Sequence, residues 1–350
     1  MIIGHSPELV DGNRSREPFM VLFGTVTLGH FAVNGFFILS GFLITQSWLR
    51  SSNFLNYLAR RSIRIYPGLI FASIISALVF GPLGGNPRYW SEFRVGRFIG
   101  GMLTLAMPNL PDTFVELHYP IVNGPIWTIR YEFACYLGLA LLGMLGFLRR
   151  RGWILGLVVG LLAFVVVQAC GVTPALPSKW ILSYKGRELP RLVSCFMVGS
   201  CFFLFREMIR YTWYGMAITL VTLFVCLYHQ PALSVLTPPM VGYLIFAVGF
   251  GPTIPLTGWV RKVDVSYGVY LYAWPFQTLI IWNFRSIDPS LLSALVIPMA
   301  MVSGWLSWSL VEKAPLRWVH RRFAAREQPR QHISIGADSL KIAEITGVRG

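Results

Sequence analysis

The chain has 350 residues, of which 55% are hydrophobic and only 13% are charged, whereas soluble domains usually carry about 25% charged residues. Its mean hydropathy is +0.58, so there are too few charges to cover a water-facing surface, and the composition excludes a disordered chain and a soluble nucleic-acid-binding domain. The net charge of +15 comes from short basic clusters between apolar runs, a pattern typical of the cytoplasmic loops of a multi-pass membrane protein.

Nine apolar segments approach the length that a helix needs to cross a membrane, which is about 20 residues. The sequence therefore predicts an all-α polytopic membrane protein with about nine transmembrane helices. The segment 190–205 is short and needs its flanking residues to cross. In chain order the predicted spans are 24–48, 65–83, 126–148, 152–171, 190–205, 211–228, 239–256, 265–282 and 291–312.

The basic clusters predict the orientation of these spans. When each cluster is placed in the cytoplasm, the spans alternate without conflict and the C-terminus lies inside. Residues 84–125 are then an outer loop with an interfacial or re-entrant piece. We expect residues 1–322 to form the membrane domain and residues 323–350 to be a polar cytoplasmic tail without fixed structure. The clusters are Arg50 with Arg60, Arg61 and Arg64; Arg149–Arg151; Arg206 with Arg210; Arg261 with Lys262; and Lys313 with Arg317, Arg321 and Arg322.

His5 follows the short apolar run Met1–Ile3. One interpretation is a helix-end histidine bonded to a backbone carbonyl, and the residues alone favour it. The other is a general base, because histidine exchanges a proton near neutral pH and suits the deprotonation of a hydroxyl. The adjacent Ser6 is a weak candidate nucleophile, because no Ser-His-Asp pattern accompanies it.

Glu132 lies about one turn inside a predicted span, with Trp127, Arg130 and Tyr131 beside it. An ionisable group costs about 2.5 to 3.5 kcal/mol near the centre of a membrane helix, so its presence calls for a partner or a role. Trp127 and Tyr131 either belong to an interfacial aromatic belt, with Arg130 paired to Glu132, or form a stacking face for a sugar beside a carboxylate that orients a base. Both interpretations stay open.

Arg60, Arg61 and Arg64 are spaced to share one face of a helix. They are either topology signals or a set of planar donors for phosphates, such as those of a cytoplasmic acyl-CoA. The chain has no Walker A motif, no GxGxxG after a strand and no cluster of metal-ligand residues, so ATP, NAD and metal ions find no support in the sequence.

Six separated segments together resemble the integral-membrane acyltransferase 3 family. Their order and spacing match that family across about 5–322, nearly the whole chain. The segments are His5-Ser6 after an apolar run; GFFILSGFLI at 35–44, like FFxLSGFLI; RRSIRIYP at 60–67, like RRxxRIxP; WTIRYEF at 127–133; VSYGVYL at 265–271, like SYxxYL before a proline; and VEKAP at 311–315, like the closing ExP element.

The resemblance implies an enzyme of about ten membrane helices in a bacterial inner membrane. It would transfer an acyl group, often acetyl, from cytoplasmic acyl-CoA to a hydroxyl of a glycan or another acceptor, with acyl-CoA as co-substrate and no bound cofactor. The family's essential first-helix histidine corresponds to His5, its RRxxR arginines to Arg60, Arg61 and Arg64, and its glutamate to Glu132. The family also has an arginine about ten residues before that histidine, so we expect the first helix to be shortened here.

These residues suggest a mechanism as a hypothesis. Acyl-CoA docks with its phosphates near the three arginines, and His5 acts as a general base or briefly carries the acyl group. Glu132 orients the histidine or the sugar, and Trp127 and Tyr131 stack on the acceptor. Two other classes of function remain open: a transporter or flippase for a lipid-linked glycan, and a membrane scaffold or sensor.

Overall fold

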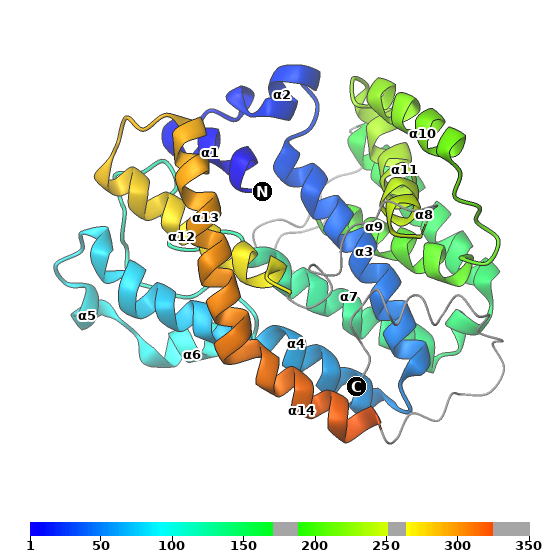
Figure 1. Cartoon of the computed structure of the whole chain (residues 1–350), viewed down its shortest axis with the longest axis horizontal. Coiled ribbons are helices and arrows are strands. Elements are labelled where there is room, and N and C mark those ends of the chain that lie inside the picture. Colours follow the sequence, from blue (N-terminus) through cyan, green and yellow to red (C-terminus); the bar gives the residue numbers. More distant parts are fainter. Residues whose placement is uncertain (171–187, 251–263, 325–350) are drawn as a thin grey trace. The chain divides into compact units, whose positions relative to one another are not determined.

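The computed structural model describes residues 1–170, 188–250 and 264–324, and every regular element in these ranges is a helix (Figure 1). Residues 325–350 of the predicted tail 323–350, the basic pair Arg261 and Lys262, and the end of the predicted span 239–256 lie outside these residues. The chain divides into two compact units. Unit 1 comprises Met1–Glu17, Arg50–Arg130 and Leu256–Gly350, and unit 2 comprises Pro18–Leu49 and Tyr131–Pro255.

Unit 1 is built from helices of both ends of the sequence. Two of its long helices, α4 and α13, continue into π-helical turns, η2 and η5. Its elements are α1 (Ile2–Asp11), η1 (Arg14–Arg16), α4 (Phe54–Ile75), η2 (Ser76–Phe80), η3 (Pro82–Gly84), α5 (Tyr89–Glu92), α6 (Val95–Leu103), α12 (Ser266–Asn283), α13 (Pro289–Ser307), η5 (Trp308–Glu312) and α14 (Lys313–Ala324).

Local sequence signals determine where several of these helices begin and end. Asn53 caps α4 by accepting a hydrogen bond from the Asn56 backbone N–H at 2.9 Å. Asp288 caps α13 in the same way, with proline at the first helical position. Gly12 ends α1 in the left-handed conformation, with φ of 74°, which glycine adopts without steric cost. The chain therefore reverses directly after α1.

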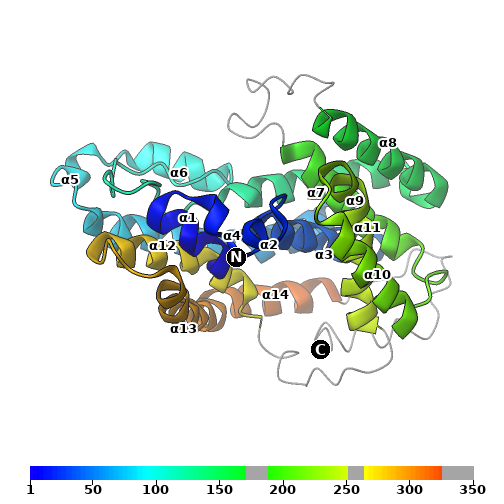
Figure 2. The ribbon, with the colours of Figure 1, turned by 90° about the horizontal axis from the view of Figure 1, so that it is seen from above.

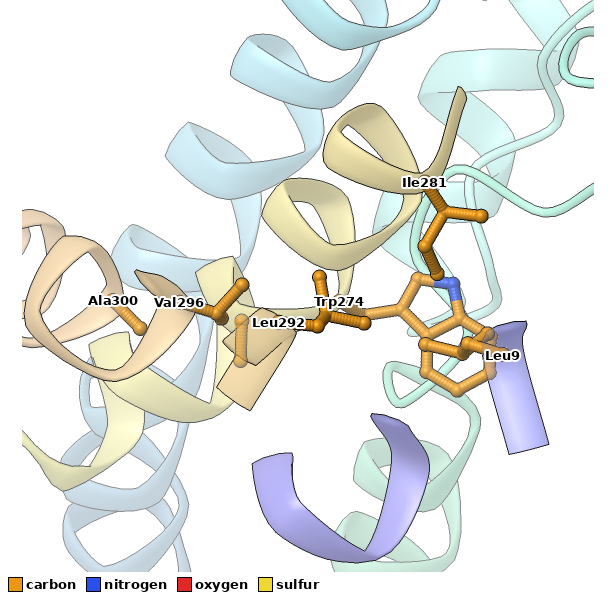
Figure 3. Packing of buried hydrophobic residues seen from close by; sticks show 7 residues of the cluster. Leu9, Trp274, Ile281, Leu292, Val296 and Ala300 are labelled. Carbon is orange, nitrogen blue, oxygen red and sulfur yellow. The ribbon is translucent and has the colours of Figure 1, made fainter. Parts of the chain in front are cut away.

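The helices α12 and α13 lie side by side, and α1 packs against both (Figure 1 and Figure 2). Gly268 and Gly304 permit this close approach, since a Cβ on Gly268 would lie 2.5 Å from the Gly304 Cα. In Figure 3, Leu9 of α1 reaches the Trp274 indole of α12. The full cluster is Leu9, Ala273, Trp274, Ile281, Leu292, Val296 and Ala300.

Two further contacts complete unit 1. The basic helix α14 runs along α4 (Figure 1). The short helix α6 also packs on α4, and the Tyr66 hydroxyl donates a hydrogen bond of 2.9 Å to the Leu103 carbonyl. The predicted outer loop 84–125 thus contains α5 and α6, and α6 has nine residues, too few to cross a membrane.

Unit 2 contains the remaining helices. The helices α3 and α9 approach closely, since Gly41 faces the Phe196 backbone and Gly199 faces the Ile38 backbone. Phe42 packs on Phe203, with ring centroids 5.2 Å apart. The elements are α2 (Pro18–Phe23), α3 (Leu28–Arg50), α7 (Trp127–Met144, of which residues from Tyr131 belong to unit 2), η4 (Phe147–Arg149), α8 (Arg151–Ala169), α9 (Glu188–Leu204), α10 (Trp213–Cys226) and α11 (Gln230–Phe250).

A helix lies at each of the nine predicted spans, but within the described residues only five helical stretches are long and apolar enough to cross a membrane. The predicted number of nine is therefore supported only in part. The other four predicted spans coincide with α7, α9, α10 and α12, which have between 14 and 18 residues. The five candidates are Leu28–Arg50, Phe54–Phe80, Arg151–Ala169, Ala232–Phe250 and Pro289–Val319.

Candidate active site

His5 lies on α1 in a polar group that also includes Glu8 and Arg14. Its Nδ1 is 3.4 Å from Glu8 Oε2, one helical turn away. The chain reversal at Gly12 brings Arg14 back to Glu8, where Nε and Nη2 donate to Oε1 at 2.9 and 2.5 Å. The imidazole also meets the Trp274 ring edge-on, with centroids 5.2 Å apart.

Electrostatics keep Glu8 ionised. Burial acts to raise its pKa, but hydrogen bonds from His5 and Arg14 outweigh burial and lower the pKa to about 2. Nearby, burial and the Glu8 carboxylate raise the pKa of Tyr119. A carboxylate that is ionised at neutral pH only accepts hydrogen bonds, so Glu8 is an acceptor for both His5 and Arg14.

Ser6 fixes the position of α1 against the helices that follow much later in the sequence. It is fully buried, and its hydroxyl donates to the Ile2 carbonyl at 3.1 Å. Gln277 of α12 and Ser293 of α13 each donate to the Ser6 oxygen at 2.8 Å. The Ser6 hydroxyl is thus engaged in hydrogen bonds that hold α1 against α12 and α13. These bonds argue against the interpretation of Ser6 as a nucleophile.

Arg64 connects α4 to two other segments of unit 1. Its guanidinium pairs with Asp264 at 2.5 Å and with Glu312 at 3.4 Å. Glu312 is 1% exposed, and the Ser307 hydroxyl donates to it at 3.0 Å. The Tyr267 ring lies 5.5 Å from the guanidinium carbon. The arginine motif at 60–67 and the closing ExP element are therefore in direct contact.

The two tyrosines of the SYxxYL element tie the remaining motifs of unit 1 together. The Tyr267 hydroxyl donates to the Ile65 carbonyl at 2.9 Å. The Tyr270 hydroxyl bonds with both the Pro125 carbonyl and the Thr128 hydroxyl at the start of α7. Each tyrosine thus holds a different motif segment against α12.

Glu132 lies in unit 2, in a buried group with Ser40 and Tyr136. Ser40 donates to its carboxylate at 3.2 Å, and the Tyr136 hydroxyl donates to the same oxygen. Ser40 is the serine of the FILSGFLI segment. Glu132, which corresponds to the family's glutamate by the resemblance, is therefore in contact with that segment. His5 belongs to unit 1.

The other predicted site residues lie on helices. Arg60 and Arg61 are half-buried on α4, one turn before Arg64. Trp127 is half-buried at the first position of α7, and Tyr131 one turn later is 4% exposed. Among the described residues, no group of three or more His, Cys, Asp or Glu side chains could hold a metal ion.

Glu8 and Arg14 belong to none of the sequence motifs, and the contacts of both with the His5 group emerge only from the structure. Glu8 carries a local signal, because a carboxylate three residues after a histidine shares a helix face with it. Arg14 carries no such signal, since its contact with Glu8 depends on the reversal at Gly12. Trp274 lies 269 positions away from His5 by sequence number, so nothing local relates the two rings.

The fold and the site define a multi-pass membrane protein whose polar side chains gather on helices around a histidine and a half-buried arginine. Residues 1–309 match the model of the acyltransferase 3 family, described as an acyltransferase domain, and the chain belongs to this family. It is therefore an acyltransferase.

Two relatives extend this finding. The chain is 28% identical over 336 residues to a protein named O-acetyl transferase from Shigella phage Sf6, covering 90% of this chain and 91% of the phage protein. It is 26% identical over 313 residues to Nodulation protein 10 of Rhizobium leguminosarum bv. viciae, covering 81% of each chain. No solved structure matches the chain.

Proposed function

We propose that the protein transfers an acetyl group from acetyl-CoA to a hydroxyl of a cell-surface or exported glycan. The similarity to the phage O-acetyl transferase over nearly the full length of both chains carries this proposal. The acyltransferase 3 family membership and the His5 environment support it. The protein would act in the bacterial inner membrane, with its C-terminus in the cytoplasm.

In the proposed reaction His5 is the general base. It removes the proton of the acceptor hydroxyl as the oxygen attacks the thioester carbonyl carbon. The bond between that carbon and the CoA sulfur breaks, the thiolate leaves and takes up a proton, and the products are an O-acetyl ester and CoA. General base catalysis contributes about 10² to 10⁴ in rate. An acyl group carried briefly on His5 is the two-step version of the same transfer.

The donor would approach from the cytoplasm. Arg60, Arg61 and Arg64 would bind its phosphates, because guanidinium groups on one helix face can donate to several phosphate oxygens. Arg64 would do so while it is held by Glu312 and Asp264.

The acceptor would be held by groups on α7. Glu132 would accept hydrogen bonds from sugar hydroxyls, and the half-buried Trp127 would provide apolar ring surface for the sugar, whereas Tyr131 is only 4% exposed and would need to move to contact it. Ser40 and Tyr136 fix the Glu132 carboxylate, which supports a positioning role.

The test uses membranes from cells that express the protein, supplied with acetyl-CoA labelled in its acetyl group. Label in the envelope glycan of these cells is measured for the wild type, for His5→Ala and for His229→Ala. His229 is an exposed histidine outside the proposed site and serves as the matched control. We expect His5→Ala to lose at least about 10²-fold in transfer rate and His229→Ala to match the wild type.

Two results would overturn the proposal. Glycan that moves across the membrane without gaining label would identify a transporter or flippase. Equal labelling with His5→Ala and wild type, at equal protein level, would remove His5 from the reaction and leave a structural role for it.

A further inference from the structure

We infer that Glu8 is a positioning residue for His5: it holds the proton-bearing Nδ1 of the imidazole, Arg14 fixes the carboxylate, and Nε2 is left as the nitrogen that takes the acceptor's proton. This inference rests on the proposed function and assigns roles to two residues that the motifs of the chain do not include. It also selects one of the two imidazole nitrogens for the chemistry.

The geometry gives each of the two Glu8 oxygens a separate partner. Oε2 faces His5 Nδ1, and Oε1 receives both N–H groups of Arg14. Glu8 is 6% exposed, so its orientation is fixed by these contacts rather than by solvent. A carboxylate held in this way can accept only from an Nδ1 that carries a hydrogen, which leaves the Nε2 lone pair of the neutral imidazole available.

Among the described residues, Glu8 is the carboxylate within hydrogen-bond distance of His5, and the nearby buried Glu17 interacts with the amino terminus of Met1. The α12 residue packed on the imidazole is Trp274, whose Nε1 donates to the Ile121 carbonyl at 2.9 Å. The other titratable groups that face this site are Tyr119, which interacts with Glu8 and Arg14, and His118, which lies over Gly12 at the end of α1. Within the described residues, Glu8 is therefore the acidic partner of His5.

The chain provides a matched control one turn further along. Asp11 and Arg16 form an ion pair of the same type between α1 and η1, but their side chains are 31% and 55% exposed and do not contact His5. Substitutions there test the general effect of removing an ion pair from this segment. Substitutions at Glu8 and Arg14 test its effect on His5.

The first measurement is acetyl transfer in membranes, with acetyl-CoA as donor and the envelope glycan of the expressing cells as acceptor. We expect Glu8→Gln to lower kcat by about 10-fold to 10²-fold and to leave the KM for acetyl-CoA within about twofold, because the loss acts on proton transfer. Arg14→Gln should lower kcat by less, and Arg14→Lys should restore most of it. Asp11→Asn and Arg16→Gln should match the wild type.

The second measurement does not depend on activity. Purified protein is treated with diethyl pyrocarbonate, which acylates neutral imidazole, and modification of His5 is followed by mass spectrometry as a function of pH. Without the carboxylate the imidazolium loses stabilisation, so we expect the midpoint of this profile to move to lower pH in Glu8→Gln but not in Asp11→Asn.

The two measurements separate the possible failures. No transfer by the wild type would reject the proposed function, and the modification profile alone would then decide whether Glu8 acts on His5. Transfer by Glu8→Gln at the wild-type rate, with an unmoved midpoint, would overturn the inference and leave the proposed function intact. A lower kcat with an unmoved midpoint would also overturn it, because Glu8 would then only stabilise the fold of this segment.

Discussion

Arg64 has a structural role in addition to the donor binding that we propose for it. Its partner Glu312 is almost completely buried, and a buried carboxylate without a cation is strongly destabilising. The sequence places Arg64 with Arg60 and Arg61 as one set, but the structure gives it two acidic partners on other segments. Replacing Arg64 should therefore affect stability as well as donor affinity.

We predict that Arg64→Ala lowers the free energy of unfolding by about 3 kcal/mol, a larger loss than Arg60→Ala causes, because it leaves the buried Glu312 without this cation. Both variants should raise the KM for acetyl-CoA. Thermal unfolding of the purified protein in detergent provides the first comparison and steady-state kinetics the second. Adding Glu312→Gln to Arg64→Ala should recover part of the lost stability. Equal unfolding temperatures for the two single variants would contradict a stabilising role for the Arg64–Glu312 pair.

At the scale of elements, the FILSGFLI segment has a packing role that its sequence does not reveal. Gly41 lies so close to α9 that a Cβ on it would be 1.8 Å from the Phe196 carbonyl oxygen. A Cβ built on Gly199 would in turn lie 1.9 Å from the Ile38 carbonyl oxygen. Small residues let membrane helices approach in this way. The glycine of this segment thus brings α3 and α9 together, beside the serine that contacts Glu132.

We predict that Gly41→Ala destabilises the protein by about 1 to 3 kcal/mol, the usual cost of overpacking a tight contact. Gly160→Ala on α8 is the matched control, because no neighbouring atom lies within 4 Å of a Cβ built there. That variant should be as stable as the wild type or slightly more stable, since alanine has a higher helix propensity than glycine. Thermal unfolding of both variants provides the measurement, and equal loss of stability would refute the close-packing role of Gly41.

Hydropathy predicts helices well in this chain, because each apolar run of suitable length became a helix. It predicts α1 poorly, since α1 has ten residues, includes Pro7 and carries the charged Glu8 and Asp11. Contacts between residues far apart in the sequence also cannot be predicted from a local sequence pattern. Arg64 and Glu312 are 248 positions apart, and only the fold shows that these two motif residues meet.

At the scale of the whole molecule, the placement of the basic clusters predicts which loops face the cytoplasm. The cluster Arg149–Arg151 should lie inside, and the loop residue Glu116, which is exposed and paired with Arg285, should lie outside. The five candidate spans support a multi-pass protein, and the side of each loop is a separate prediction.

We expect Glu116→Cys to react with a membrane-impermeant maleimide in intact spheroplasts and Arg150→Cys to react only after lysis. The background carries Cys170→Ser and Cys201→Ser, because Cys170 is exposed and Cys201 half-buried, while the other three cysteines are buried. That background without a new cysteine is the control for residual labelling. Reaction of Arg150→Cys in intact spheroplasts would contradict the predicted orientation and indicate the inverse one.

The hydrogen bonds of Ser6 have a consequence for the order of biosynthesis. The side chains that fix α1 belong to Gln277 and Ser293, which lie 271 and 287 positions after Ser6 in the chain. During translation α1 is thus made long before the helices that hold it, and residues near the amino end emerge first. The histidine beside Ser6 reaches its fixed position only when α12 and α13 have been synthesised. A partly made chain would therefore contain the proposed general base but not its fixed surroundings, and under the proposed function the ability to catalyse transfer would arise among the last events of synthesis.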